Sequence, residues 1–232
     1  MWQLDLPLLR WLNRIADASP ALTRAITWVY WDPLKTALVA ALLWWAWFDG
    51  DDGERRARAR ELVAAGLGGS VACVALVRLL AAVLPFRLRP LADPALGLHF
   101  PLTTNGWGEW SAFPSDNAVM FSMLSVCLFA VSRPLGVLAA LDTVALICFP
   151  RVFLGIHHPT DVGGGLLIGG AAGWIITRVP VRRTLAFPAQ ALLRWRPQLF
   201  YASAFLVTYL LTEVFWPVTR AVVTVMKLAR GL

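Results

Sequence analysis

The hydrophobic residues of this chain gather in long runs, and most polar residues fall between the runs. Six runs have the length of a membrane-spanning helix, at about 25–48, 62–84, 114–131, 135–154, 159–177 and 199–218. About 20 helical residues cover the roughly 30 Å of a bilayer's hydrocarbon core. Because backbone polar groups in lipid must be satisfied internally, we predict an all-α, polytopic membrane bundle of about six transmembrane helices.

Residues 7–17 show a different pattern, with apolar and polar positions on opposite faces of a helix. The polar face carries Arg10, Asn13, Arg14 and Asp17. A short amphipathic helix of this kind lies in the membrane interface, so we predict an N-terminal interfacial helix without a role in chemistry. Ser19-Pro20, a capping residue followed by a first-turn proline, then starts the next helix.

The composition excludes a soluble globular protein and most non-membrane functions. Hydrophobic residues make up 58% of the 232 residues, charged residues only 15%, and the mean hydropathy is +0.63. The three cysteines lie inside apolar runs, which argues against a disulfide framework and gives no metal-ligand spacing. We find no repeat and no linker, so residues 1–232 are predicted to form a single integral membrane domain.

Positive charge is concentrated in three of the predicted loops. The loops at 49–61, 132–134 and 178–198 hold ten arginines, which lie on one side if there are six spans. The positive-inside rule places these loops in the cytoplasm and the loops at 85–113 and 150–160 outside. We therefore expect an inner (plasma) membrane protein. The net charge of +7 is explained by topology and anionic lipid headgroups rather than by a nucleic-acid partner.

The most distinctive segment is Arg151-Val-Phe-Leu-Gly-Ile-His157-His158-Pro159-Thr160-Asp161, between two apolar runs. Ionisable groups at the edge of a membrane span are candidates for function. An aspartate near a histidine can hold one ring nitrogen as N–H and leave the other free to attack. An arginine supplies a fork of donors for phosphate oxygens.

Two further segments, Arg87-Leu88-Arg89-Pro90 and Pro114-Ser115-Asp116-Asn117, fall on the same predicted side. Together the three segments resemble the signature of the type 2 phosphatidic acid phosphatase family, which shares its core with vanadium haloperoxidases. That signature is Lys, six residues, Arg-Pro; then Pro-Ser-Gly-His; then Ser-Arg, five residues, His, three residues, Asp. The resemblance covers about residues 60–180 and looks closest to bacterial undecaprenyl-diphosphate phosphatases.

The resemblance implies roles for the matching residues. His157 would be the catalytic nucleophile, with Asp161 orienting and charge-stabilising its ring. Arg89 and Arg151 would bind the phosphate oxygens. Ser115, Asp116 and Asn117 open a helix whose free N–H groups form an anion site. Arg87 is either a further substrate-binding arginine or a surface charge, and His158 is a neighbour of the site.

Four residues depart from the family pattern: Ala82 replaces the lysine, Pro150 replaces the serine, and Asp116-Asn117 replaces the Gly-His pair. Asn117 cannot act as the general acid, because an amide does not titrate. Arg78 lies one helical turn before Ala82, so it could supply the missing cation. The alternative is a buried pair between Arg78 and Asp142.

We therefore predict a membrane lipid phosphatase that works through a phosphohistidine intermediate at the outer membrane face, without a metal or other cofactor. A site lacking the histidine acid should prefer a lipid diphosphate, such as a polyprenyl diphosphate, because its leaving group is already a stable anion. The alternatives are a phosphotransferase that uses another acceptor, and a catalytically impaired relative that binds lipid phosphate. The expected partners are the substrate and membrane lipids, and the sequence leaves the oligomeric state open.

Overall fold

The computed structural model describes residues 2–49, 53–103 and 111–213, and all regular structure in these ranges is helical. The all-α prediction is confirmed. The helices are α1 (Trp2–Ala18), α2 (Pro20–Trp31), α3 (Leu34–Phe48), α4 (Gly53–Val83), α5 (Asp116–Val131), α6 (Arg133–Asp142), α7 (Phe149–Phe153), α8 (Pro159–Ile176), α9 (Val179–Trp195) and α10 (Pro197–Thr212). Short 3₁₀ turns lie at Pro90–Ala92 and Pro94–Leu96, and a π-helical segment, Thr143–Cys148, joins α6 to α7.

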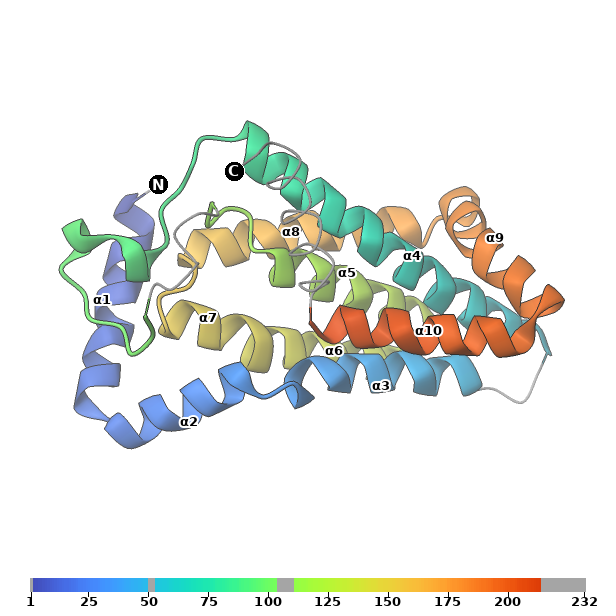
Figure 1. Ribbon diagram of the computed structural model, residues 1–232, viewed down its shortest axis with the longest axis horizontal. Helices are drawn as coiled ribbons and strands as arrows, with labels where there is room; N and C mark the ends of the chain where they lie inside the picture. The colour runs from blue at the N-terminus through green and yellow to red at the C-terminus, as the bar shows by residue number, and fades with distance from the viewer. Residues whose placement is uncertain (1, 50–52, 104–110, 214–232) are drawn as a thin grey trace, which may run out of the picture.

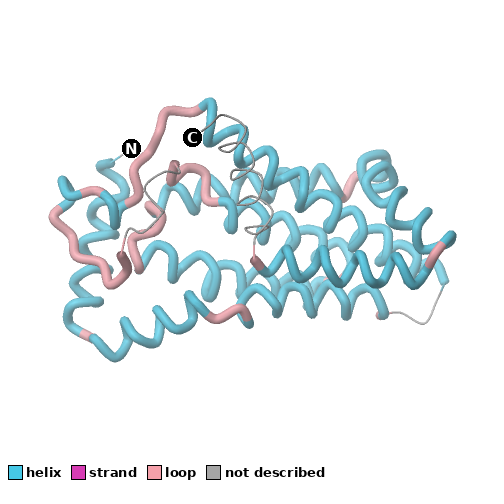
Figure 2. The backbone as a smooth tube through the Cα atoms, in the orientation of Figure 1, coloured by secondary structure: helices cyan, strands magenta, loops and turns pink. Residues whose placement is uncertain are grey.

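Most helices run along the long axis of the molecule, and α1 crosses one end of the bundle (Figure 1). The long connection from α4 to α5 and the turn from α7 to α8 lie at that same end (Figure 2). α9 lies at the opposite end (Figure 1). The loops that carry the three sequence motifs are therefore gathered at one end of the bundle.

Two described helices, Gly53–Val83 and Arg133–Phe153, are long and apolar enough to cross a membrane. A third crossing is possible if α8 and α9, which meet at a bend of 84°, count as one broken span. α3 and α5 are apolar but shorter. The count of six spans stays a prediction, and the end of the sixth predicted run lies outside the described residues.

The two charged segments expected to be loops are instead largely helical, and that prediction is wrong. Most of 49–61 belongs to α4, and most of 178–198 forms α9. Arginine and alanine are good helix formers, so a run rich in them can continue a helix. The charges of such a run indicate only that the segment is exposed to water. Arg182 Nε on α9 donates to Glu61 Oε2 on α4 at 2.9 Å, so a hydrogen bond connects these two charged helical segments.

The first predicted span is broken into α2 and α3 at Asp32-Pro33. Proline has no backbone N–H to continue the helix, and the Asp32 side chain accepts a hydrogen bond from Leu34 N at 2.7 Å. The predicted start at Ser19-Pro20 is confirmed, with the Ser19 side chain accepting from Leu22 N. The predicted N-terminal helix is also present and begins earlier, at Trp2.

Close packing of α5 against α8 sets the geometry of the motif end. Gly165, Gly169 and Gly173 are buried on one face of α8. A Cβ atom at Gly165 would lie 2.8 Å from the Ala118 Cβ, so only glycine allows this approach of the two helices. The contact brings the start of α5 to the start of α8, where Ser115 N donates to Asp161 O at 3.3 Å.

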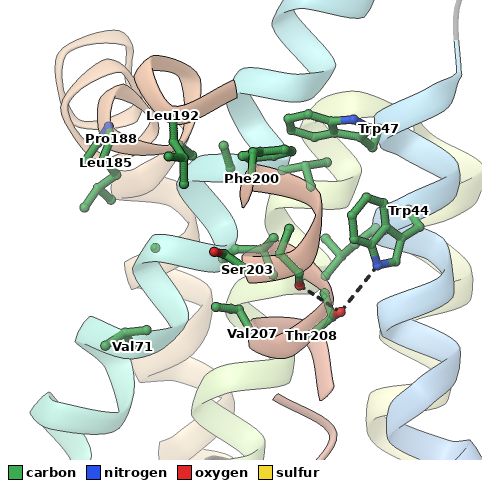
Figure 3. A pocket seen from close by; sticks show the side chains of 17 residues that line it. Trp44, Trp47, Val71, Leu185, Pro188, Leu192, Phe200, Ser203, Val207 and Thr208 are labelled. Atoms are coloured by element: carbon green, nitrogen blue, oxygen red, sulfur yellow. Dashed lines mark hydrogen bonds between the residues drawn. The ribbon is translucent and has the colours of Figure 1, made fainter. Parts of the chain in front are cut away.

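An apolar cavity of about 250 Å³ lies among α3, α4, α9 and α10. Trp44, Trp47 and Phe200 form part of its wall, and Trp44 Nε1 donates to Thr208 Oγ1 at 3.4 Å (Figure 3). None of the motif residues lines this cavity.

Candidate active site

The three sequence motifs converge at the end of the bundle where the long loop lies. Arg89 precedes the first 3₁₀ turn, Ser115 caps α5, Arg151 lies on α7, and His157 lies in the turn before α8. All four side chains are buried. Charged groups this deep require specific partners, so the contacts of each define what the site can do.

The His157 ring is held by a backbone carbonyl. Its Nδ1 atom lies 2.8 Å from Ala112 O, and its backbone N–H donates to Arg151 O at 3.2 Å. A carbonyl oxygen can only accept, so Nδ1 carries the ring proton and the lone pair is on Nε2. Arg89 Nη1 lies 3.4 Å from Nε2. The nitrogen that carries the lone pair therefore faces an arginine, a side chain suited to bind a phosphate oxygen.

Burial, reinforced by the positive charge of Arg89, lowers the pKa of His157 to about 3. His157 is thus neutral across the physiological pH range, which is the form that can attack phosphorus. The turn that presents it depends on Gly155, whose φ is 74°, and the Phe100 ring packs 2.6 Å from where a Cβ atom would be. Leu91 N donates to Gly155 O at 2.9 Å, joining the long loop to this turn.

Asp161 contacts His158 more closely than it contacts His157. Its Oδ2 atom accepts from the His158 backbone N–H at 2.7 Å and lies 3.2 Å from His158 Nδ1. The distance from Asp161 Oδ2 to His157 Nδ1 is 3.9 Å, too long for a hydrogen bond. The Ala112 carbonyl therefore orients the His157 ring, while Asp161 acts on it through charge. A backbone carbonyl has no signature in a sequence, so sequence reasoning missed Ala112.

Backbone carbonyls hold the guanidinium groups of Arg89 and Arg151. Arg89 Nη1 donates to Ile156 O at 3.0 Å, and Arg151 Nη1 donates to Ile147 O at 2.7 Å. The Arg151 guanidinium also lies over the Tyr30 ring, 5.5 Å from its centroid. These contacts hold both guanidinium groups at the site before any ligand binds.

The start of α5 offers polar atoms that the protein does not satisfy. Ser115 Oγ and Asn117 Oδ1 are buried and have no hydrogen-bond partner within the described residues. They lie at the positive end of the α5 dipole, where the Asn117 backbone N–H donates to Asp116 Oδ1 at 2.8 Å. Buried polar atoms normally have partners, so the Ser115 hydroxyl can donate to a ligand oxygen here, whereas Asn117 Oδ1 can only accept and needs an O–H or N–H donor on a ligand.

Arg78 reaches the site from α4. Its Nη2 atom lies 3.5 Å from Asp116 Oδ2, and Asp116 Oδ1 accepts from the Asn117 side-chain amide at 2.9 Å. The carboxylate oxygens of Asp142, the alternative partner of Arg78, accept no hydrogen bond within the described chain. The geometry favours Arg78 as a cation of the site.

Arg87 lies between two buried carboxylates. Its Nη1 atom donates to Asp161 Oδ1 and, at 2.8 Å, to Thr160 Oγ1, and its Nη2 atom lies 2.5 Å from Asp5 Oδ2. Sequence reasoning missed Asp5 and Thr160. A signal for Asp5 was present, because it falls on the same helical stripe as the buried residues Leu9 and Leu12.

Within the described ranges, no group of three or more His, Cys, Asp and Glu side chains could hold a metal ion. The groups that converge at the motif end are instead a neutral histidine, arginines and a helix N-terminus. Side chains of these types are suited to phosphate oxygens and include one nitrogen with a free lone pair.

Comparison with known proteins gives the family of this chain. The sequence model of the PAP2 superfamily matches residues 60–185, so this chain is a member of the PAP2 superfamily and a membrane protein. Glucose-6-phosphatase 3 of Mus musculus is 53% identical over 38 residues, which cover 16% of this chain and 11% of the mouse protein. The chain thus spans a small part of that relative's length. No solved structure matches the chain.

Proposed function

We propose that this protein is a lipid phosphatase that transfers a phosphoryl group from a membrane lipid to His157 and then to water. The observation that carries the proposal is the geometry of His157. Its Nδ1 proton is held by Ala112 O, and its Nε2 lone pair faces Arg89 in a buried setting. A neutral, oriented imidazole beside a phosphate-binding cation is the arrangement that nucleophilic phosphoryl transfer requires.

In the first step the Nε2 lone pair attacks the terminal phosphorus, and the bond from phosphorus to the leaving oxygen breaks. Arg89 and Arg151 bind the equatorial oxygens as their charge develops, and Ser115 donates to one of them from the start of α5. In the second step water attacks the phosphohistidine and releases inorganic phosphate. The water's proton goes to a base or to the departing phosphate, and His157 returns to its neutral form.

The remaining site residues have supporting roles in this proposal. Arg78, held by Asp116, supplies the cation that Ala82 lacks. Asp161 stabilises the positive charge that appears on the His157 ring when it is phosphorylated. Arg87 does not bind substrate in this proposal. It holds Asp161, because its terminal nitrogens are already directed at Asp161 and Asp5.

A lipid substrate fits the position of the site. The motif loops lie at one end of a bundle of apolar helices, so a phosphate group bound there can remain attached to a chain in the bilayer. The distribution of arginines supports an outward-facing site in the inner (plasma) membrane. Asn117, which cannot protonate an alkoxide, favours a diphosphate such as a polyprenyl diphosphate.

Asn117 and Ala82 also favour a second candidate function, a catalytically impaired protein that binds lipid phosphate. A transferase that passes the phosphoryl group to an alcohol is a third possibility with the same first step. The first step separates these functions: hydrolase and transferase both phosphorylate His157, and the impaired relative does not.

Phosphate release by the purified protein in detergent micelles tests the proposal. The substrates are a polyprenyl diphosphate, the matching monophosphate, phosphatidic acid and water-soluble glucose 6-phosphate. We expect release from the lipids, strongest from the diphosphate, with His157→Ala inactive and His158→Ala retaining activity. Preference for glucose 6-phosphate would contradict the lipid assignment. Acid-labile labelling of His157 without phosphate release would support the transferase, and binding without labelling would support the impaired relative.

A further inference from the structure

We propose that Asp5 on α1 is a positioning residue of the active site, which acts through Arg87 to fix the position of Asp161 and to keep the buried Asp5, Arg87 and Asp161 group net negative. The inference rests on the proposed phosphoryl transfer by His157. It gives the N-terminal helix a part in catalysis that its amphipathic pattern does not indicate. α1 lies outside residues 60–185, which the superfamily model matches.

Asp5 makes more specific contacts than docking a helix requires. Its side chain is 1% exposed. Oδ1 accepts from the Thr160 backbone N–H at 2.9 Å, and Oδ2 accepts from Thr160 Oγ1 at 2.8 Å and from Arg87 Nη2 at 2.5 Å. Both oxygens therefore bind the segment immediately before Asp161.

Arg87 continues the connection to the catalytic histidine. Its Nη1 atom donates to Asp161 Oδ1, and Asp161 Oδ2 lies 3.9 Å from His157 Nδ1. Asp5, Arg87, Asp161 and His157 thus form a continuous buried path from α1 to the nucleophile. A buried guanidinium held from both sides has one fixed position, and so has the carboxylate bound to it.

The charges in this path explain why a second carboxylate is useful. Asp5 and Asp161 share one guanidinium, so the buried trio carries a net charge of −1 when all three groups are ionised. If Asp5 carried no charge, the positive charge of Arg87 would cancel the negative charge of Asp161, and the trio would have no net charge. Asp161 would then do less to stabilise the positive ring that forms when His157 is phosphorylated. The effect falls on the transition state and not on substrate binding, because Asp5 does not touch the phosphate-binding groups.

A purely structural account of Asp5 is that it anchors α1. The helix already has an apolar anchor in Leu9 and Leu12, and Asn13 Nδ2 donates to His99 O at 2.5 Å. Leu12→Ala therefore loosens the same helix without changing any charge. It is the matched control for a change at Asp5, and Asp17→Asn, an exposed carboxylate on the same helix, controls for charge.

The experiment measures kcat and KM for a polyprenyl diphosphate in wild type, Asp5→Asn, Asp5→Glu and both controls, with the melting temperature of each. We expect Asp5→Asn to lower kcat about 10- to 100-fold with KM nearly unchanged, as when a catalytic group is slightly misplaced. Asp5→Glu should recover part of the loss because it keeps the charge. Orthovanadate, a transition-state mimic, should inhibit Asp5→Asn more weakly than wild type, whereas inhibition by inorganic phosphate should not change.

Wild-type kcat in Asp5→Asn would overturn the inference while leaving the proposed function intact. Equal losses of kcat in Asp5→Asn and Leu12→Ala at equal melting temperatures would also overturn it. The anchoring of α1 would then be enough to explain the loss of kcat in Asp5→Asn. If Asp5→Asn does not fold, Thr160→Val tests the same link by removing the hydroxyl shared by Asp5 and Arg87; kcat equal to wild type there would count against it. An inactive wild-type protein refutes the proposed function, and the inference falls with it.

Discussion

The Nδ1 atom of His157 lies 2.8 Å from the carbonyl oxygen of Ala112, and this contact places the ring proton on Nδ1 and the lone pair on Nε2. The ring of His158, one residue further, points its Nδ1 atom at Asp161 instead, at 3.2 Å. The Nδ1 atoms of these two adjacent histidines therefore have different partners, and the Nε2 atom of His157 lies 3.4 Å from Arg89 Nη1.

This difference predicts that phosphorylation occurs on His157 alone. His157→Gln should abolish turnover, and a rapid acid-labile label from terminally labelled substrate should be absent from this variant. His158→Gln should keep the label, with a reduced rate because it disturbs the partner of Asp161. Quench-flow labelling followed by peptide mapping is the measurement. A label on His158 in the wild-type protein would refute the assignment.

The lowered pKa of His157 predicts how stability depends on pH. Burial lowers the pKa to about 3 in the folded protein, whereas an unfolded histidine titrates near 6.5. The folded state therefore resists protonation. The stability that this group contributes is complete above pH ~6.5 and is lost as the pH falls from ~6.5 toward 3.

His157→Gln removes this titration and serves as the reference. The melting temperature of wild type minus that of His157→Gln should decrease as the pH falls from 7 to 4. A difference that stays constant over this range would show that His157 titrates normally in the folded protein.

Arg78 gives a prediction about the missing family lysine. Arg78→Ala should lower kcat/KM about 10²- to 10³-fold, the usual effect of removing one charge-stabilising donor. Adding Ala82→Lys to this variant should restore part of the activity, because residue 82 lies one turn along the same helix face. Arg133→Ala, at the exposed first residue of α6, is the control and should have little effect. Failure of Ala82→Lys to restore any activity would argue against the replacement.

The convergence of the motif residues could be predicted from sequence because each lies at the end of an apolar run. Arg89, Ser115 and Arg151 follow or precede runs that end on one side, so the alternation of the chain brings them together. The same reasoning placed Arg78 within reach of the site. Hydrophobic periodicity and motif spacing predict which residues meet, because each span has a fixed length and successive spans cross the membrane in opposite directions.

The partners of these residues could not be predicted in the same way. Ala112 acts through its backbone, which every residue possesses. Asp5 bonds Arg87 across 82 residues of sequence, and nothing local to either residue indicates that pairing. The arginine-rich segments were misassigned as loops because charge reports contact with water, whereas helix formation depends on backbone propensity and packing.

The α5–α8 contact predicts a contrast between neighbouring glycines. A Cβ atom at Gly173 would lie 2.7 Å from the Val126 Cβ, whereas one at Gly170 would meet nothing within 4 Å. Gly173→Ala should therefore destabilise the protein by about 1–3 kcal/mol, the usual cost of overpacking. Gly170→Ala should be neutral or slightly stabilising. Thermal unfolding in detergent is the measurement, and equal melting temperatures for the two variants would contradict the close packing.

Asn117 predicts the preferred leaving group. Its side-chain amide donates to Asp116 Oδ1 and cannot release a proton to an alkoxide. Positioned acid catalysis is worth about 10²- to 10⁴-fold, so a phosphate monoester should be a poor substrate for this site. A diphosphate needs no such acid, because the departing lipid phosphate is already a stable anion. The wild-type enzyme should therefore prefer a diphosphate over a monophosphate with the same polyprenyl chain.

Asn117→His tests this reasoning directly. A histidine at residue 117 would follow Asp116 at the start of α5, in the position that the family histidine occupies by resemblance. If the missing acid sets the preference, kcat for the monophosphate should rise in this variant and kcat for the diphosphate should change little, so the ratio of the two narrows. Asn117→Gln, which keeps an amide, is the control and should not raise the monophosphate rate. Equal rates for the two substrates in the wild-type protein would mean that another group supplies the proton, and the substrate assignment would then be wrong.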